Sequence, residues 1–352
     1  METGETYKSK FFINSDGISH LTSFLRNNDN RKMFILVDSN TKIFCLDYFI
    51  SLFNIKAIIL TISSGEGSKS IDCVTFLIDE LINHNADKDS VLINLGGGVV
   101  SDLGAFVASI FNRGISYINI PTTLLAQVDA SVGGKNGINF NGIKNKIGLI
   151  NNPLFTIILT NFLKTLPEEE IISGYGEVFK YGLIFDSNLW FKISSCDISE
   201  AVDIEDVIYQ SVIIKESIVK QDLYDNGLRK TLNFGHTIGH AIESSSEDGF
   251  QISHGLSIVS GMICELYISH ILLKLPKKKL DIYVKVLNSN FALKKIKNTS
   301  NIISLIRHDK KNQKGKLLFS LISKIGHCHF NQEVSEDLVE RSLTFYNSLY
   351  HE

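Results

Sequence analysis

The chain has 352 residues, of which 44% are apolar and 21% are charged, a composition typical of globular proteins. Its formal net charge of −3 offers no basic excess for a nucleic acid or an anionic membrane, and its four prolines exclude a collagen or a proline-rich linker protein. The length predicts about two domains.

The five cysteines are scattered and form no CxxC pair, which argues against a disulfide scaffold or a cysteine-based zinc site. The first ten residues lack the apolar centre of a signal peptide, and no continuous apolar run reaches the roughly 18 residues of a membrane span. We therefore expect a soluble cytoplasmic protein.

Short apolar segments alternate with helical patterns in the first half of the chain. The apolar segments, each closed by a turn signal, predict strands at 32–38, 55–62, 90–95 and 115–120. Apolar residues at helical spacing predict helices at 70–84 and 99–111. Buried strands that alternate with helices indicate a parallel sheet covered on both faces.

The second half of the chain is mainly helical. From about Pro167 onward the spacing predicts helices at 168–185, 205–220, 236–245, 255–275, 277–287 and 334–349. A β-hairpin is predicted around 316–323, with Gly326 after it. We therefore predict an α/β fold, with an N-terminal Rossmann-like parallel-sheet domain at 1–165 and a mainly α-helical domain at 166–352.

A glycine cluster, Gly96–Gly98, follows an apolar strand and opens a helix. Glycines allow a pyrophosphate to approach the backbone, and a helix N-terminus attracts it, although an ordinary strand-to-helix turn has the same pattern. Asp38 also lies at a strand end, where a carboxylate can hold a ribose hydroxyl. The loop at 64–69 adds the cation Lys69 at a third strand end. Together these segments favour a nucleotide-binding edge.

Histidines and one glutamate form a candidate metal set. His236 and His240 lie four residues apart on one helix face, and His254 begins a further helix. Glu177 lies at helical spacing from Lys180. Two or three histidines with one carboxylate are typical of a catalytic zinc site. A histidine pair on a helix is more often structural, so spacing alone leaves both interpretations open.

Cations gather among Gly- and Asn-rich segments. They are Arg113, Lys135, Lys144, Lys146, Lys215, Arg229, Lys310 and Lys311. Lysines are usually solvated surface charges, but three of these lie in or just after Gly-rich turns, near Asp129. Such a set suits an anionic substrate that carries phosphate and carboxylate groups.

Four segments resemble one enzyme family. They are PTTLLAQVDASVGGK at 121–135, Lys144-Asn145, GEVFKYG at 176–182 and GLRKTLNFGHTIGHAIE at 227–243. Together they resemble the 3-dehydroquinate synthase family of sugar phosphate cyclases, and the resemblance extends from about Leu36 to Gly326. Its long motifs are too specific to arise by chance.

The resemblance implies conversion of 3-deoxy-D-arabino-heptulosonate 7-phosphate to 3-dehydroquinate and phosphate, in the shikimate pathway of aromatic amino acid biosynthesis. In this lyase reaction NAD transiently oxidises a ring hydroxyl, phosphate leaves by elimination, the hydride returns, the ring opens and an intramolecular aldol step follows. The N-terminal domain would bind NAD, and the helical domain the metal and the substrate. A homodimer is implied as well.

The resemblance also implies site residues. A divalent metal, zinc or cobalt, would be held by Glu177, His236 and His254. The substrate would be surrounded by Asp129, Lys135, Asn145, Lys180, Lys215, Arg229, Asn233, His240 and Lys311 (or Lys310 in its place). Arg113 would reach the substrate phosphate from the neighbouring subunit. NAD would contact Asp38, Glu66, Lys69, Gly97, Gly98, Asp102, Thr122, Thr123, Lys144, Phe162 and Thr165.

Three motifs depart from the family pattern without removing a ligand. Leu256 stands where the family has a carboxylate, Ser101 replaces a glycine before an exchanged Gly-Ala pair, and Tyr175-Gly176 precedes Glu177. The alternatives are another sugar phosphate cyclase, an NAD-dependent polyol or glycerol-phosphate dehydrogenase of similar architecture, and a non-catalytic homologue. The intact metal set argues against the last of these.

Overall fold

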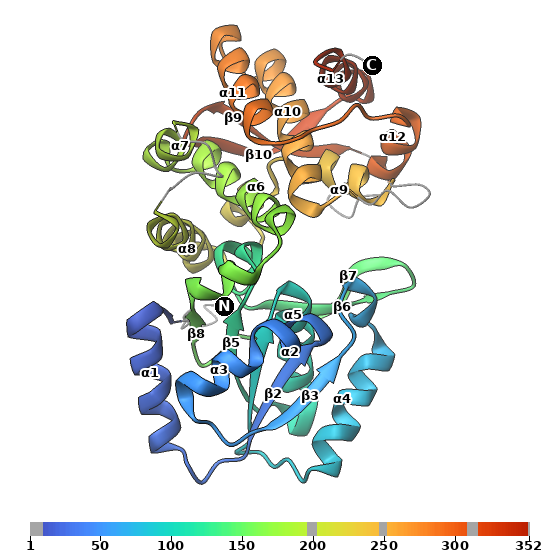
Figure 1. Ribbon diagram of the computed structural model, residues 1–352. Coiled ribbons are helices and arrows are strands. Elements are labelled where there is room, and N and C mark those ends of the chain that lie inside the picture. Colours follow the sequence, from blue (N-terminus) through green and yellow to red (C-terminus); the bar gives the residue numbers. More distant parts are fainter. Residues whose placement is uncertain (1–9, 196–202, 246–251, 308–315, 351–352) are drawn as a thin grey trace. The chain divides into compact units, whose positions relative to one another are not determined.

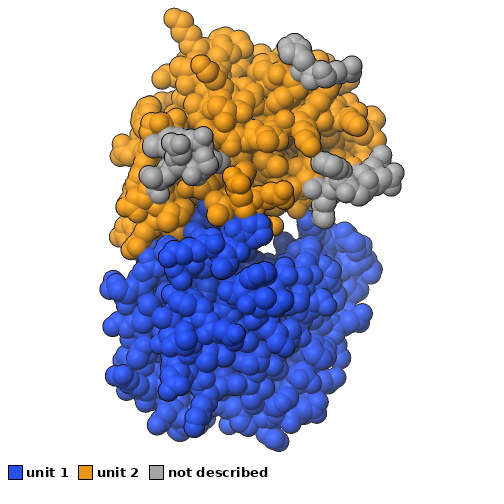
Figure 2. Space-filling model, in the orientation of Figure 1, with its two compact units in different colours: residues 1–167 blue, residues 168–352 orange. Residues whose placement is uncertain are grey.

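The computed structural model describes residues 10–195, 203–245, 252–307 and 316–350. The chain divides into two compact units, residues 1–167 and 168–352, which are coloured separately in Figure 2. Each unit has its own layers and its own core (Figure 1).

The first unit is built on a parallel sheet of six strands (Figure 1). In spatial order they are β1 (Phe11–Ile13), β8 (Thr156–Ile158), β5 (Ser116–Pro121), β4 (Val91–Gly96), β2 (Met33–Asp38) and β3 (Ile58–Ile62). Every neighbouring pair is parallel. The predicted α/β class with a parallel sheet is confirmed.

Helices cover both faces of this sheet because its strands are apolar on both sides. On β2, Phe34 and Leu36 join one core cluster, whereas Ile35 and Val37 join the other. The first cluster includes side chains of α4 (Ile71–Asn83) and α5 (Gly98–Ile110), and the second includes side chains of α1 (Asn14–Asn27) and α3 (Leu46–Phe53). Each fully buried Leu, Ile or Phe stabilises this arrangement by about 1.5–3 kcal/mol.

The sequence did not predict several elements of this unit. These are β1, α1, α2 (Ser39–Phe44), α3, β8 and an antiparallel hairpin of β6 (Lys135–Phe140) and β7 (Ile143–Ile150). Lys135, Lys144 and Lys146, expected in or just after glycine-rich turns, lie on the strands of this hairpin, shortly after Gly133-Gly134 and the Asn141-Gly142 turn. Its tight connection is Asn141-Gly142, with φ of 49° and 75°, the left-handed conformations typical of a two-residue hairpin turn.

The second unit is mainly helical, as predicted (Figure 1). It contains α6 (Glu168–Ile184), α7 (Ser187–Ser194), α8 (Ile204–Gln221), η5 (Leu228–Asn233), α9 (His236–Ser244), α10 (His254–Leu272), α11 (Lys277–Asn290), α12 (Thr299–Arg307) and α13 (Glu336–Ser348). The predicted hairpin is formed by β9 (Leu317–Lys324) and β10 (His327–Val334), with Gly326 in its turn at φ 77°.

Helix α10 is the central helix of this unit. By length and composition it could cross a membrane, but 72% of the relevant stretch is buried inside the structure, as expected for a core helix. It ends at Leu272, earlier than the predicted 275, because Lys274 turns into the left-handed region at φ 56° and Pro276 begins α11 as its N-cap.

Candidate functional site

Glycines bring the backbones of α6, α9 and α10 unusually close. A Cβ on Gly255 of α10 would lie 2.0 Å from the carbonyl oxygen of Ser173 on α6. A Cβ on Gly261 would lie 2.0 Å from the carbonyl oxygen of Gly235, which precedes α9. Gly176 is restricted similarly, since its Cβ would lie 2.9 Å from the carbonyl oxygen of Gly255. The departure at position 176 therefore fits this crossing of helices, where a side chain has no space.

Two side chains fix the first residues of the crossing helices. The Gly255 N–H donates to the Ser173 hydroxyl at 3.0 Å, which ties the start of α10 to α6. The Gly235 N–H donates to Oε2 of the fully buried Glu265 at 2.6 Å, while Gly235 adopts φ 80°. Only glycine adopts this conformation at low cost. The start of α9 is thus held against α10.

The predicted metal set converges at this crossing. Glu177 Oε1 lies 3.4 Å from His236 Nε2 and 3.7 Å from His254 Nε2. Two ligand atoms that are each about 2.1 Å from a tetrahedral ion lie about 3.4 Å apart. Glu177 is fully buried, and a metal ion would add to Lys180 in compensating the negative charge of its carboxylate. The residues present therefore fit a divalent metal ion such as zinc.

Both imidazoles present the correct nitrogen to such an ion. His236 Nδ1 lies 3.1 Å from the carbonyl oxygen of Phe234, and His254 Nδ1 lies 3.2 Å from Glu243 Oε2. Burial lowers the pKa of His254, but Glu177 and Glu243 outweigh burial and raise that pKa to about 9. Metal binding to His254 would therefore release a proton from this ring.

The other candidate residues of the second unit lie on α6, α8, η5 and α9. Lys180 of α6 is 2% exposed and forms an ion pair with Glu177. Lys215 of α8 and Arg229 of η5 are buried, which is unusual for cations. These two side chains are therefore not the solvated surface charges that lysines and arginines usually are. The ring of His240 lies 5.1 Å from that of His236, and Asn233 ends η5.

Most candidate NAD residues share one edge of the sheet in the first unit. Asp38 ends β2, the loop with Glu66 and Lys69 follows β3, Gly97-Gly98 follows β4, and Thr122-Thr123 follows β5. In a parallel sheet these carboxyl ends form the edge that binds ligands. The Asp38 carboxylate also caps α2, accepting N–H bonds from Asn40 and Thr41 at 2.9 and 2.8 Å.

Lys69 lies at the centre of a polar network at this edge. Its Nζ is 2.7 Å from Asp102 Oδ2 and 2.6 Å from Asn145 Oδ1, although the residue is only 4% exposed. Asn139 joins the network through Glu66 Oε1 at 2.9 Å. Lys69 thus links α5 to the β6–β7 hairpin.

Gly104, also on α5, faces the buried Asn94 of β4. The Oδ1 atom of Asn94 would lie 1.9 Å from a Cβ at position 104. The exchange of the family's Ala-Gly for Gly104-Ala105 therefore fits the packing of this unit.

Several candidate residues are placed differently. Arg113 precedes β5, so it lies at the sheet edge opposite to the NAD candidates. Phe162 and Thr165 lie in the 3₁₀ segment η4 (Thr160–Thr165). The Phe162 side chain is 3% exposed and belongs to the core, so Phe162 can offer a ligand only its backbone, whereas Thr165 can also offer its hydroxyl group. Asp129 lies in a π-helical turn, and Lys135 and Lys144 are exposed. Lys310 and Lys311 lie outside the described residues.

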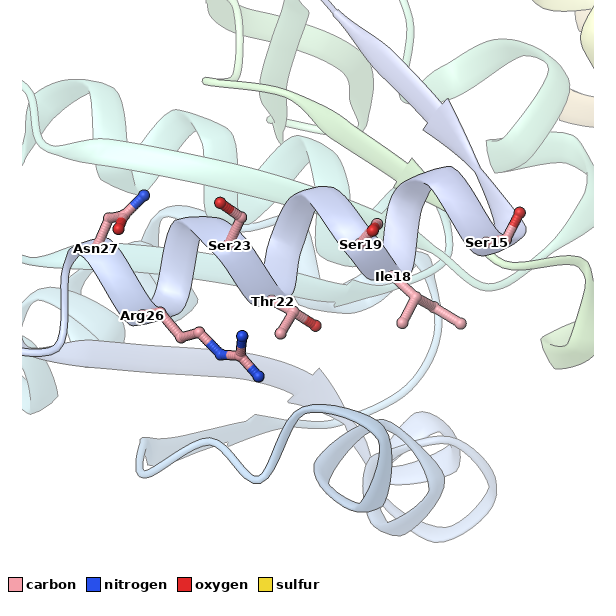
Figure 3. A pocket seen from close by; sticks show the side chains of 7 residues that line it. All are labelled: Ser15, Ile18, Ser19, Thr22, Ser23, Arg26 and Asn27. Atoms are coloured by element: carbon pink, nitrogen blue, oxygen red, sulfur yellow. The ribbon is translucent and has the colours of Figure 1, made fainter.

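A shallow depression along α1 is not a candidate site. Its volume is about 710 Å³, and its lining is Ser15, Ile18, Ser19, Thr22, Ser23, Arg26 and Asn27. Figure 3 shows that these side chains all come from one face of a single helix. None of them is buried, so the surface holds no converging polar groups that could orient a ligand.

Family models cover most of the chain. The model described as 3-dehydroquinate synthase N-terminal matches residues 59–173, and the model described as 3-dehydroquinate synthase C-terminal matches residues 174–312. The chain belongs to the 3-dehydroquinate synthase family. This agrees with the resemblance in the sequence motifs.

Curated 3-dehydroquinate synthases are similar over nearly the whole length. The one from Parabacteroides distasonis is 40% identical, over 97% of this chain and 99% of the relative. The one from Clostridium tetani is 35% identical, over 97% of this chain and 93% of the relative. The chain is therefore similar to these lyase-type cyclases over both of its units.

Solved structures share the fold of this 3-dehydroquinate synthase family member. A 2-deoxy-scyllo-inosose synthase complexed with carbaglucose-6-phosphate, NAD+ and Co2+ has a TM-score of 0.85 and 25% identity, over 96% of this chain and 99% of that one. A 2-epi-5-epi-valiolone synthase from Streptomyces hygroscopicus with NAD+ and Zn2+ bound has a TM-score of 0.86 at 20% identity, over 99% of both chains.

An iron-containing alcohol dehydrogenase from Thermococcus thioreducens also has this fold, with a TM-score of 0.70 and 13% identity, over 98% of this chain and all of that chain. Fold alone therefore does not separate cyclases from dehydrogenases.

Several polar residues that organise the site have no role predicted from the sequence. These are Ser173, Asp222, Glu243 and Glu265. For Glu243 a signal exists, because it lies three residues after His240 and seven after His236, on the same helix face. The other three contact residues distant in sequence or hold a loop backbone, and no periodicity reveals such contacts.

Proposed function

We propose that the chain converts 3-deoxy-D-arabino-heptulosonate 7-phosphate to 3-dehydroquinate and phosphate, the shikimate-pathway reaction after which its family is named. The observation that carries the proposal is the convergence of Glu177, His236 and His254 in a chain 40% identical to a curated 3-dehydroquinate synthase over 97% of its length. A buried carboxylate facing two imidazoles is chemistry for holding a metal, not for packing a core.

Zinc or cobalt would be held by these three residues, and NAD by the sheet edge that carries Asp38, Gly97-Gly98 and Lys69. When bound, NAD supplies a reversible hydride acceptor and the metal ion supplies a Lewis acid. Two structural relatives hold NAD+ with Co2+ or Zn2+ according to their descriptions, which supports this pair of cofactors. Lys69 would keep its partner Asp102 oriented at that edge.

The chain's own residues would bind and orient the substrate. Lys215 and Arg229 are buried cations, a residue type suited to binding the anionic groups of a sugar phosphate. Lys180 would orient Glu177 and contact substrate oxygens, Asn233 would donate to hydroxyl groups, and His240 would carry a proton. The remaining proposed contacts are those of Asp129, Lys135, Asn145 and Lys311.

The enzyme is proposed to act as a cytoplasmic homodimer. Arg113 is exposed and belongs to the sheet edge opposite to Asp38 and Gly97, so it does not serve that edge of its own unit. It lines a depression of about 620 Å³ together with Arg31 and Lys88. In a homodimer, this exposed guanidinium would bind the phosphate group of the substrate held by the second copy of the chain.

The test is phosphate release from 3-deoxy-D-arabino-heptulosonate 7-phosphate with NAD and zinc, together with NMR of the product. We expect 3-dehydroquinate to form only when both cofactors are present. Glu177→Ala and His254→Ala should abolish turnover while the fold is retained, and Glu333→Ala, an exposed position on β10 paired with Lys316, is the matched control. Near-normal turnover of either site variant would contradict the metal assignment.

Two other outcomes would identify an alternative function. Phosphate release from other sugar phosphates but not from this substrate would indicate a sister cyclase, an alternative supported by the 25% identical 2-deoxy-scyllo-inosose synthase. Stoichiometric accumulation of NADH from a polyol would indicate a dehydrogenase, because a cyclase returns the hydride in each turnover.

A further inference from the structure

A second group of potential metal ligands overlaps the first. His240, Glu243 and His254 also place one ligand atom each within 4.8 Å of one another, as Glu177, His236 and His254 do. His254 belongs to both groups. Each ring nitrogen of His254 faces one of the two groups. A nitrogen that binds a metal needs a free lone pair, so the protonation of the ring decides which group can hold the ion.

The nitrogens of His254 face different carboxylates. Nε2 lies 3.7 Å from Glu177 Oε1, and Nδ1 lies 3.2 Å from Glu243 Oε2. An ionised carboxylate only accepts hydrogen bonds, so a ring nitrogen bonded to it carries the proton. When the ring loses its second proton on metal binding, Glu243 consequently stabilises the tautomer with a proton on Nδ1 and a lone pair on Nε2, the nitrogen that faces Glu177.

We propose that Glu243 is a positioning residue for the metal centre: its carboxylate fixes the tautomer and the ring orientation of His254 and does not itself bind the ion. The proposal rests on the metal site assigned under the proposed function. A carboxylate that accepts from the second nitrogen of a ligand histidine sets the ring orientation and raises the basicity of the ligand.

His236 shows why this contact matters for one ligand only. Its Nδ1 is held by the carbonyl oxygen of Phe234 at 3.1 Å, a backbone group that no substitution removes. His254 depends instead on a side chain of another helix. Glu243 lies near the end of α9, and His254 is the first residue of α10, so the contact also joins these two helix ends.

The experiment measures metal affinity in the full chain without substrate. Zinc dissociation constants are obtained by chelator competition for the wild type, Glu243→Ala, Glu243→Gln and Glu177→Ala, and the Co2+ absorption spectrum of each protein is recorded. We expect Glu243→Ala to weaken zinc binding by about 10–100-fold. The spectrum should still show all three protein ligands.

The isosteric variant distinguishes orientation from simple packing. The amide oxygen introduced by Glu243→Gln can still accept from Nδ1, so this variant should recover part of the affinity that Glu243→Ala loses. Glu177→Ala should lose a ligand and change the spectrum. Glu333→Ala is the charge-matched control on β10 and should bind zinc like the wild type.

Two results would overturn the proposal. Zinc affinity of Glu243→Ala and Glu243→Gln within about twofold of the wild type would show that His254 needs no orienting carboxylate. A ligand lost from the Co2+ spectrum in Glu243→Gln, with Glu177→Ala spectrally normal, would make Glu243 a ligand. Failure of the proposed function is a separate result, because a folded protein could bind zinc in a Glu243-dependent way and release no phosphate.

Discussion

The carboxylate of Asp222 organises the loop that leads to Arg229. It accepts backbone N–H bonds from Asn226 at 2.9 Å, Gly227 at 2.7 Å and Arg229 at 2.9 Å. Partial burial raises the pKa of Asp222, but these bonds and the Arg229 charge outweigh burial, so the pKa lies below the ordinary value. The Arg229 guanidinium is in turn anchored to the Leu223 carbonyl oxygen at 2.8 Å.

Asp222→Asn should loosen this loop and raise the KM for the sugar phosphate more than it lowers kcat, because Arg229 is proposed to bind substrate. The free energy of unfolding should fall by about 1.5–3 kcal/mol, the contribution of hydrogen bonds to a charged acceptor. Steady-state kinetics and thermal unfolding measure the two effects. Asp186→Asn, which removes the charge from the cap of α7, is the control that should leave KM unchanged.

The pH dependence of stability gives a second readout on Asp222. Because its native pKa is depressed, its contribution is fully present above the unfolded value of 3.8 and is lost as the pH falls through the native pKa. The difference in unfolding free energy between the wild type and Asp222→Asn should therefore be constant at neutral pH and shrink below about pH 4. A difference that grows on acidification would contradict the role of the ionised carboxylate.

At the scale of elements, the close crossing of α6 and α10 determines whether the metal ligands can meet. Gly255→Ala would place a methyl group 2.0 Å from the Ser173 carbonyl oxygen, and a backbone atom cannot rotate away. We expect a destabilisation of about 3 kcal/mol or more and weaker zinc binding, since the helices must separate. Thermal unfolding and chelator competition test this.

Gly67→Ala is the control for this glycine substitution, because a Cβ there would meet nothing within 4 Å. Its unfolding temperature and zinc affinity should match those of the wild type. A Gly255→Ala protein with normal zinc affinity would show that Glu177 and His254 do not depend on the helix crossing.

The elements that the sequence predicts are those with strong local patterns. Strand β4 is predicted correctly because it is a continuous apolar run, and helix α9 because its polar and apolar residues lie on opposite helix faces. The missed β1 has three residues and forms its ladder with β8, more than 140 residues later in the chain, so no local pattern reveals it. The β6–β7 hairpin is not predicted because its glycines, asparagines and lysines have the composition of a loop.

The candidate site follows the same division. Spacing places His236 and His240 on one helix face, and the structure confirms the helix. That Glu177 faces both His236 and His254 depends on how three helices cross, which spacing does not contain. The motif resemblance supplied that grouping. The orienting contacts of Glu243 and Asp222 needed the three-dimensional structure.

At the scale of the whole molecule, the position of Arg113 is consistent with its proposed role at the site of a partner subunit. Residues 112 and 113 both have positive φ, 50° and 64°, in a turn that is exposed at the sheet edge opposite to Asp38. Asparagine adopts this conformation readily, whereas for an arginine it costs about 1–3 kcal/mol, and such strained residues cluster at functional sites. The proposed dimer with shared phosphate sites would give this strained arginine a function.

Mixing two inactive variants tests the shared site. Arg113→Ala keeps its metal ligands, and Glu177→Ala keeps its arginine, so each homodimer should be nearly inactive. In a mixed dimer one site would combine the intact Glu177 of one protomer with the intact Arg113 of the other. After random exchange of subunits half of the dimers are mixed, and one of their two sites is intact, so about a quarter of wild-type phosphate release should return. Mixtures of dimeric variants that exchange subunits, as checked by mass spectrometry, yet stay inactive would place Arg113 outside the partner's site.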